Sequence, residues 1–272
     1  MATPILVTGG TGTLGRHVVA RLGEVGCDVR VLSRGKRAGG ADGVAYAIGD
    51  QSTGEGVDAA VEGVEVVVHC AGSPKGDGEK ARHLVRAAAG AHVRHLINIS
   101  VVGADRVPVV SGVDRAMFGY FASKLDAERV GAESGLPWTT LRATQFHDLT
   151  LTTVRGMAKL PVIPVPTGFR FQPVDTGEVA ARLVELALGP PAGLVPDLAG
   201  PRVYEMGELL RSYLRASGQR RVLVPVGVPG GAARAIRAGA NVAPDRAVGR
   251  RTWEDFLAAE VAPSCDRSSR AS

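Results

Sequence analysis

A tyrosine stands four places before a lysine in the segment YFASK, residues 120–124. On a helix this spacing places Tyr120 and Lys124 on one face. A phenol is a weak acid at neutral pH, and a neighbouring ammonium stabilises its ionised form. Such a pair can pass a proton to a carbonyl oxygen while hydride arrives at the carbon. A core tyrosine beside a solvated lysine has the same spacing, so the interpretation depends on the elements around the pair.

Short apolar, β-branched runs alternate with segments suited to helices along the first half of the chain. The runs are 4–8, 29–33, 44–48, 64–70, 95–100 and 138–142. Continuous apolar strands are typical of a parallel sheet covered on both faces, and parallel neighbours require crossover helices. The pattern predicts an α/β fold with a Rossmann-type doubly wound parallel sheet. YFASK then lies between the fifth and sixth strands.

A glycine-rich turn, TGGTGTLG, follows the first predicted strand and precedes a segment suited to a helix. This is the context of a dinucleotide-binding loop, in which glycines allow a tight turn, a close approach to the pyrophosphate and close packing of helix on strand. The N-terminus of the helix then faces the phosphates. The residues expected to bind the cofactor here are Gly9, Gly12, Thr13, Leu14 and Gly15.

The ends of the next strands predict the adenosine half of the site. Arg34 stands where an NAD-specific site would place a carboxylate, and its guanidinium can grip a ribose 2′-phosphate. NADP(H) is therefore preferred over NAD(H), with a solvated basic loop as the alternative. Asp50 either accepts a hydrogen bond from the adenine amino group or caps the next helix. The residues expected in this half are Ser33, Arg34, Arg37, Asp50, Ala71 and Gly72.

The alternation of apolar runs and helical segments ends near residue 150, which predicts a second part of the chain. Residues 161–175 are rich in proline and glycine, and amphipathic helical segments follow. We expect residues 1–150 to form an NAD(P)-binding core and 151–262 to form a small C-terminal substrate-binding cap intertwined with that core. Residues 263–272 are expected to be a disordered tail.

Composition narrows the range of partners. The 272 residues carry a net charge of +5, but no basic run interleaved with aromatics favours nucleic acid. The three cysteines lie too far apart for a disulfide framework or a zinc cluster, and His92 and His95 lack partners at ligand spacing, so no metal is expected. No apolar run approaches a membrane span. We expect a cytoplasmic protein.

Several motifs in order resemble the short-chain dehydrogenase/reductase superfamily, and most closely its atypical, NmrA-like branch. They are TGGTGTLG, VLSR, GD at 49–50, AG at 71–72, INIS, YFASK and WTTLRATQF. The resemblance extends from residue 4 to about 180, and RTWEDFLA near the end is similar to the final helix of actinobacterial members.

The resemblance implies a role for each candidate residue. Tyr120 would donate or accept the proton, Lys124 would bind the nicotinamide ribose, and Ser100 would orient the carbonyl. Ser111 remains an alternative to Ser100, because it lies in the segment that follows the fifth strand. The segment after the sixth strand implies the substrate-pocket residues Thr144, Gln145, Phe146 and His147.

The function implied is NADPH-dependent transfer of hydride to a carbonyl, quinone or conjugated enone. The proline-rich stretch and the cap helices favour a hydrophobic small molecule, such as a polyketide or another aromatic metabolite, and the protein is expected to be a monomer or homodimer. A binding protein that senses NADP(H) without turnover is the alternative. A sugar-nucleotide epimerase shares the tyrosine and lysine, but the cap is short for a nucleotide sugar.

Overall fold

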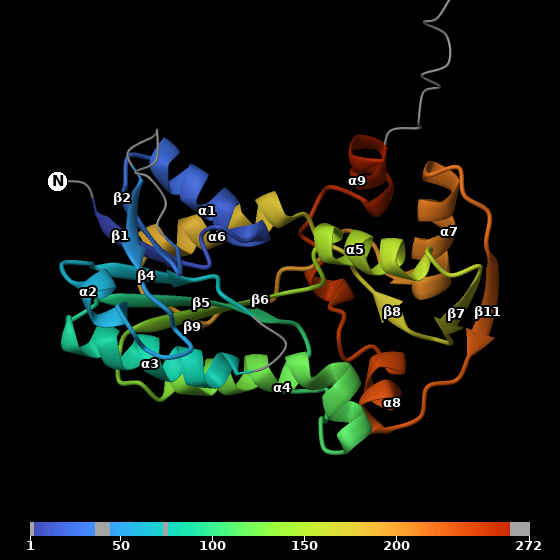
Figure 1. Cartoon of the computed structure of the whole chain (residues 1–272), viewed down its shortest axis with the longest axis horizontal. Coiled ribbons are helices and arrows are strands. Elements are labelled where there is room, and N and C mark those ends of the chain that lie inside the picture. Colours follow the sequence, from blue (N-terminus) through green and yellow to red (C-terminus); the bar gives the residue numbers. More distant parts are fainter. Residues whose placement is uncertain (1–2, 36–43, 73–75, 262–272) are drawn as a thin grey trace, which may run out of the picture.

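The computed structural model describes residues 3–35, 44–72 and 76–261. In this part of the chain, seven parallel strands form one sheet in the order β3-β2-β1-β4-β5-β6-β9 (Figure 1). The order reverses between β1 and β4, where parallel sheets of this kind bind ligands at the carboxyl ends of their strands. The strands are β1 (Pro4–Thr8), β2 (Asp28–Ser33), β3 (Ala45–Ile48), β4 (Val66–His69), β5 (His95–Val101), β6 (Trp138–Ala143) and β9 (Gly193–Leu194).

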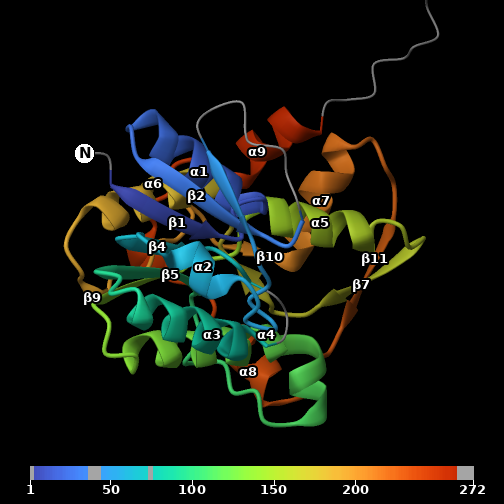
Figure 2. The ribbon, with the colours of Figure 1, turned by 60° about the vertical axis from the view of Figure 1, so that its left-hand side comes forward.

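Helices cover both faces of the sheet. On one face lie α1 (Thr13–Glu24) and α6 (Thr176–Leu188), and on the other lie α2 (Val57–Val61), α3 (Asp77–Gly90) and α4 (Gly112–Ala132) (Figures 1 and 2). The central strands β4 and β5 are buried at every position. Ile5 and Val7 pack in the core under α1 and α6, whereas Leu6 packs in the core under α2 and α3. The predicted doubly wound sheet is therefore confirmed.

A smaller part of the chain stands beyond the carboxyl ends of the strands (Figure 1). Two short sheets, β8 with β10 and β7 with β11, pack with helices around a separate core that includes Tyr204, Leu209, Leu210 and Trp253. Its elements are α5 (His147–Met157), β7 (Val162–Pro166), β8 (Arg170–Phe171), β10 (Tyr204–Glu205), α7 (Met206–Ala216), β11 (Val222–Val226), α8 (Gly231–Arg237), the 3₁₀ turn Pro244–Arg246 and α9 (Trp253–Glu260).

The chain passes from the core to this cap and back again. α6 and β9 lie within the segment 151–262 that the sequence assigned to the cap, yet α6 covers the sheet and β9 extends it. The predicted cap segment thus includes residues of the sheet layer. The predicted tail, 263–272, lies outside the described residues. Among the described helices, none has the length and apolarity that a membrane crossing requires.

Candidate active site

A cleft of about 1270 Å³ opens at the carboxyl edge of the sheet, between core and cap. The glycine turn and the ends of β2, β3 and β4 line one half, and α4, α5 and the cap line the other. Arg37 lies outside the described residues. The remaining predicted cofactor and catalytic residues all line the cleft: Gly9, Gly12, Thr13, Leu14, Gly15, Ser33, Arg34, Asp50, Ala71, Gly72, Ser100, Tyr120 and Lys124.

The glycine turn has the geometry of a phosphate cradle. Gly9 has a φ of +66°, which favours glycine, and its carbonyl accepts the N–H of Gly12 at 2.9 Å. A Cβ on Gly15 would lie 2.1 Å from the Gly9 oxygen, so only glycine lets α1 begin this close to β1. Thr13 then opens α1 at the cleft. These residues fit a dinucleotide pyrophosphate, because the helix N-terminus and the close backbone approach meet at one place.

The two sequence interpretations of Asp50 can be compared with the structure. Its Oδ1 accepts the N–H of Ser52 at 2.8 Å, whereas α2 begins at Val57 after Gly56. Asp50 therefore organises its own turn and does not cap that helix. The hydrogen bond from Ser52 lowers the pKa of Asp50, and the charge of Arg34 contributes in the same direction. A carboxylate and a guanidinium thus share this end of the cleft, where β2 and β3 end.

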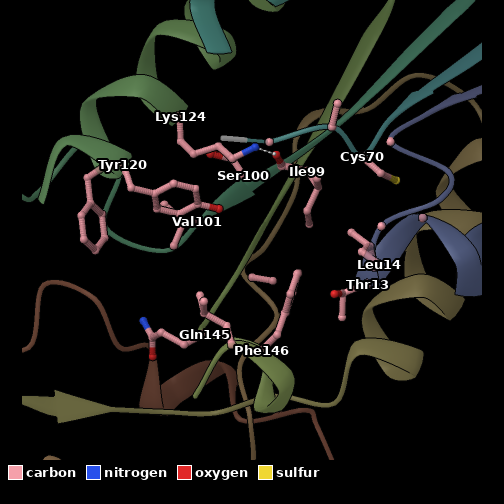
Figure 3. Close-up of a pocket in the computed structure, with 18 of the residues that line it drawn as sticks. Thr13, Leu14, Cys70, Ile99, Ser100, Val101, Tyr120, Lys124, Gln145 and Phe146 are labelled. Carbon is pink, nitrogen blue, oxygen red and sulfur yellow. Dashed lines mark hydrogen bonds between the residues drawn. The ribbon is translucent and has the colours of Figure 1, made fainter. Parts of the chain in front are cut away.

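Tyr120 and Lys124 lie on α4 beside the end of β5, with very different exposure. Tyr120 is 37% exposed, and Figure 3 shows its ring directed into the cleft toward Ser100. Lys124 is 2% exposed, and its Nζ lies 5.8 Å from the centre of the Tyr120 ring. The ammonium donates to the carbonyl of Ile99 at 3.4 Å (Figure 3). A Cβ on Gly72 would lie 2.9 Å from Nζ, so a larger residue there would crowd the lysine.

The two candidate serines occupy different environments. Ser100 is 4% exposed at the end of β5, and its Oγ has no hydrogen-bond partner among the described residues. Ser111 accepts the N–H of Asp114 at 3.0 Å and forms the capping box that begins α4. Ser100 lines the cleft and Ser111 does not. Of the two, Ser100 is the hydroxyl placed beside Tyr120.

The predicted substrate-pocket residues divide in the structure. Thr144, Gln145 and Phe146 line the cleft, and Figure 3 shows Gln145 and Phe146 across it from Tyr120. His147 does not line the cleft, and this prediction is corrected. Its ring is fully buried, and its Nε2 lies 3.0 Å from the carbonyl oxygen of Arg251.

The position of His147 has a plain physical cause. The residue begins α5, and its ring stacks on Phe256 and Trp253 at centroid distances of 4.9 and 6.0 Å. Burial lowers the pKa of His147, which favours the neutral imidazole. It therefore joins α5 to α9 as part of the cap core.

Sequence reasoning missed the residues that the cap brings to the cleft. Gln145 connects the two parts, because its Nε2 donates to the carbonyl of Asn241 at 3.0 Å and its Oε1 accepts the N–H of Gln172 at 3.1 Å. Asn241 itself lines the cleft. No local signal could have indicated it, since the contact depends on how the cap folds. The apolar residues lining the cleft near the cap are Met117, Phe118, Phe121, Phe146, Leu149, Met157, Phe169, Phe171, Met206 and Ile236.

The Cys70 thiol also lines the cleft. Burial raises the pKa of the Cys70 thiol to about 12, so it is protonated at neutral pH. Over the described ranges, no group of three or more His, Cys, Asp or Glu residues is placed to hold a metal ion.

The fold and the cleft define a dinucleotide-binding α/β protein with a tyrosine–lysine pair beside the end of β5. Residues 9–188 match the model of a family described as NAD(P)H-binding. The chain belongs to this NAD(P)H-binding family.

Relatives of known type support this assignment. The chain is 30% identical over 223 residues to (4-alkanoyl-5-oxo-2,5-dihydrofuran-3-yl)methyl phosphate reductase of Streptomyces griseus, covering 79% of this chain and 74% of the relative. It is 29% identical over 254 residues to ceramide reductase of Caulobacter vibrioides, covering 83% and 74%. These reductases confirm the prediction of an NAD(P)H-dependent oxidoreductase at the level of enzyme class.

A solved structure shares the whole architecture. The NADPH-dependent quinone oxidoreductase of Escherichia coli, complexed with NADPH, matches with a TM-score of 0.75 and 18% identity, over 94% of this chain and 99% of that chain. At this identity the likeness shows the fold alone. Because the match covers 94% of this chain, it includes the cap as well as the sheet.

Proposed function

We propose that the protein is an NADPH-dependent reductase that delivers hydride to a carbonyl, quinone or conjugated enone of an uncharged, apolar small molecule. The observation that supports this most directly is the meeting of Tyr120, Lys124 and Ser100 at one point of the cleft. The glycine cradle lies in the same cleft, and the apolar wall of the cap closes the other half.

The proposed preference for NADP(H) rests on the charges of the adenosine end. Arg34 and Lys80 both line this half of the cleft, and both positive charges lower the pKa of Asp50. A ribose 2′-phosphate would gain from these cations, because a guanidinium binds phosphate oxygens with paired hydrogen bonds. The Asp50 carboxylate accepts the N–H of Ser52 through its Oδ1, so this oxygen is engaged within its own turn.

The proposed substrate class rests on the other half of the cleft. Aromatic and methionine side chains dominate its lining, including Phe121, Phe169 and Met206. Among the described residues that line the whole cleft, the cations are Arg34, Lys80 and Lys124. Arg34 and Lys80 act on Asp50 at the end of β3, and Lys124 is paired with the buried carboxylate of Asp77. The Streptomyces griseus relative is named for a phosphate ester, and a phosphate requires cationic partners. We therefore expect an uncharged substrate here.

The proposed mechanism assigns one task to each residue. When bound, the cofactor supplies the hydride from its nicotinamide. Tyr120 donates its phenolic proton to the substrate oxygen as negative charge develops there, and the nearby Lys124 ammonium stabilises the resulting phenolate. Ser100 donates a second hydrogen bond to the same oxygen. Ser100 is free to do so because its hydroxyl has no partner among the described residues.

The test is NADPH oxidation by wild type and Tyr120→Phe against a panel of aromatic ketones, quinones and conjugated enones. We expect turnover by the wild type and a loss of at least about 10²-fold in kcat for the variant, with NADPH affinity unchanged. Tyr46→Phe is the matched control, because Tyr46 is half-buried on β3 and does not line the cleft. Equal rates for wild type and Tyr120→Phe would remove the proposed role. NADPH binding without turnover of any acceptor would favour a nucleotide-sensing protein.

A further inference from the structure

The carboxylate of Asp77 lies against the ammonium of Lys124. Asp77 Oδ2 and Lys124 Nζ are 3.4 Å apart, and the two side chains are 1% and 3% exposed. Asp77 is the first residue of α3, and Lys124 lies in the second half of α4, so the pair joins two neighbouring helices. A buried pair of opposite charges at this distance fixes both groups, because neither can exchange its partner for water.

Helix packing sets the position of Asp77 in two ways. Its N–H donates to Ser123 Oγ at 3.0 Å, so consecutive residues of α4 hold its backbone and its carboxylate. The next residue is Gly78, where a Cβ would lie 2.9 Å from the Cβ of Asp126. Glycine at this place allows α3 to approach α4 closely. The placement of the carboxylate is therefore part of the helix contact.

The other titratable groups around Lys124 leave it dependent on Asp77. Burial lowers the pKa of His69 to about 3, and the positive charges of Lys124 and Lys80 add to this effect. Burial raises the pKa of Cys70 to about 12, so neither residue is charged at neutral pH. Lys80 is itself cationic and lies 3.7 Å from Asp77 Oδ1. Asp77 supplies the carboxylate that lies within 4.0 Å of Lys124 Nζ in the part of the chain that the structure describes, residues 3–35, 44–72 and 76–261.

We propose that Asp77 is a positioning residue that keeps Lys124 charged and in place beside Tyr120. This inference rests on the proposed function, because the charge matters through the phenolate that it stabilises. Removing one partner of a buried pair leaves an uncompensated charge, which is strongly unfavourable. Without Asp77, the Lys124 amine loses its proton at a lower pH. Tyr120 then lacks the neighbouring positive charge when the pH rises.

The first test reads the charge of Lys124 directly. The chain has five lysines, Lys36, Lys75, Lys80, Lys124 and Lys159, so spectra of protein labelled with ¹³C at the lysine ε-carbon are simple. Lys124→Met identifies the signal. We expect the titration midpoint of Lys124 to fall by about one pH unit or more in Asp77→Asn. Glu79→Gln is the matched control. Glu79 is exposed on the same first turn of α3, and its replacement by glutamine removes one negative charge, as Asp77→Asn does.

The second test follows turnover across pH with the same variants. We expect the alkaline limb of the kcat profile of Asp77→Asn to move toward lower pH by the same interval as the Lys124 midpoint, while KM for the acceptor changes less than about twofold. A purely structural role would lower the melting temperature without moving the pH profile. Asp77→Ser, a smaller neutral variant that suits a helix N-terminus, replaces Asp77→Asn if the latter does not fold.

The outcomes separate this inference from the proposed function. An unchanged Lys124 midpoint in the neutral Asp77 variants overturns the inference, whatever the turnover. If no variant, including wild type, reduces any acceptor, the proposed function fails while the midpoint still decides the role of Asp77. If Tyr120→Phe is inactive and Asp77→Asn keeps the wild-type midpoint and pH profile, only the inference about Asp77 fails.

Discussion

Replacing Gly15 by alanine should abolish tight cofactor binding without changing the chemical groups of the site. The new Cβ would lie 2.1 Å from the oxygen of Gly9, 2.6 Å from the Cα of Gly10 and 2.7 Å from the carbonyl carbon of Gly9. All three contacts are backbone atoms, so the turn must move by about 1 Å to restore a normal separation. A displacement of this size costs about 10²-fold where geometry is matched to a ligand. We expect a hundredfold rise in Kd for NADPH, or about 2.8 kcal/mol.

The matched control is Gly23→Ala on the same helix. Nothing lies within 4 Å of a Cβ at Gly23, which is exposed in the last turn of α1. Alanine there should raise the free energy of unfolding by about 0.5–1 kcal/mol, because glycine costs conformational entropy in a helix. Calorimetric titration with NADPH and thermal unfolding measure both variants. A Kd for Gly15→Ala within threefold of the wild-type value would refute the steric reasoning.

Three further predictions address the cofactor, the serine and acid stability. Arg34→Ala should raise Kd for NADPH relative to Kd for NADH by about tenfold or more, since the bidentate partner of the 2′-phosphate is lost; an unchanged ratio by titration would reject the assignment. Ser100→Ala should lower kcat by about 10²-fold, whereas Ser111→Ala should lower the free energy of unfolding by about 1 kcal/mol and leave kcat unchanged. The reverse pattern would transfer the catalytic role to Ser111. Because burial above all lowers the pKa of His69 to about 3, the unfolded chain binds one more proton than the folded chain between about pH 6.5 and pH 3. Stability from this residue is thus lost as the pH falls, by about 1.4 kcal/mol per unit, and His69→Gln should remove that slope in denaturant unfolding. A difference between wild type and variant that does not depend on pH would contradict this.

The parts of the site that could be predicted are those encoded within one strand–turn–helix unit. The spacing of Gly9, Gly12 and Gly15 after an apolar strand specifies the turn, because a Cβ on Gly12 or Gly15 would meet backbone atoms of Gly9 or Gly10, and Gly9 itself has a φ of +66°. The spacing of Tyr120 and Lys124 specifies one face of a helix. The ends of parallel strands meet at one edge, so Arg34 and Asp50 could be placed together without knowledge of the cap.

The parts that could not be predicted depend on residues that meet only after folding. His147 follows the sixth strand as a pocket residue would, but aromatic rings of α9 draw it into the cap core. Asn241 reaches the cleft from the segment after α8 and carries no sequence signal. The dependence of Lys124 on Asp77 likewise exists only because Gly78 and Ser123 bring α3 and α4 together.

The residues encoded within the core and those supplied by the cap should respond differently when the substrate preference is altered by mutation. The cradle and the Tyr120–Lys124 pair belong to the core, where the buried Asp77 carboxylate ties α3 to α4 and leaves little room for variation. The apolar wall belongs largely to the cap, which contacts the core through polar links such as the hydrogen bond from Gln145 Nε2 to the carbonyl of Asn241. Introducing a cation at Met206, which lines the cleft from the cap, should therefore alter acceptor preference toward anionic substrates and leave NADPH binding intact. Activity of Met206→Lys on phosphorylated and unphosphorylated acceptors would measure this, and a loss of NADPH affinity would show that the two halves of the cleft are not separable.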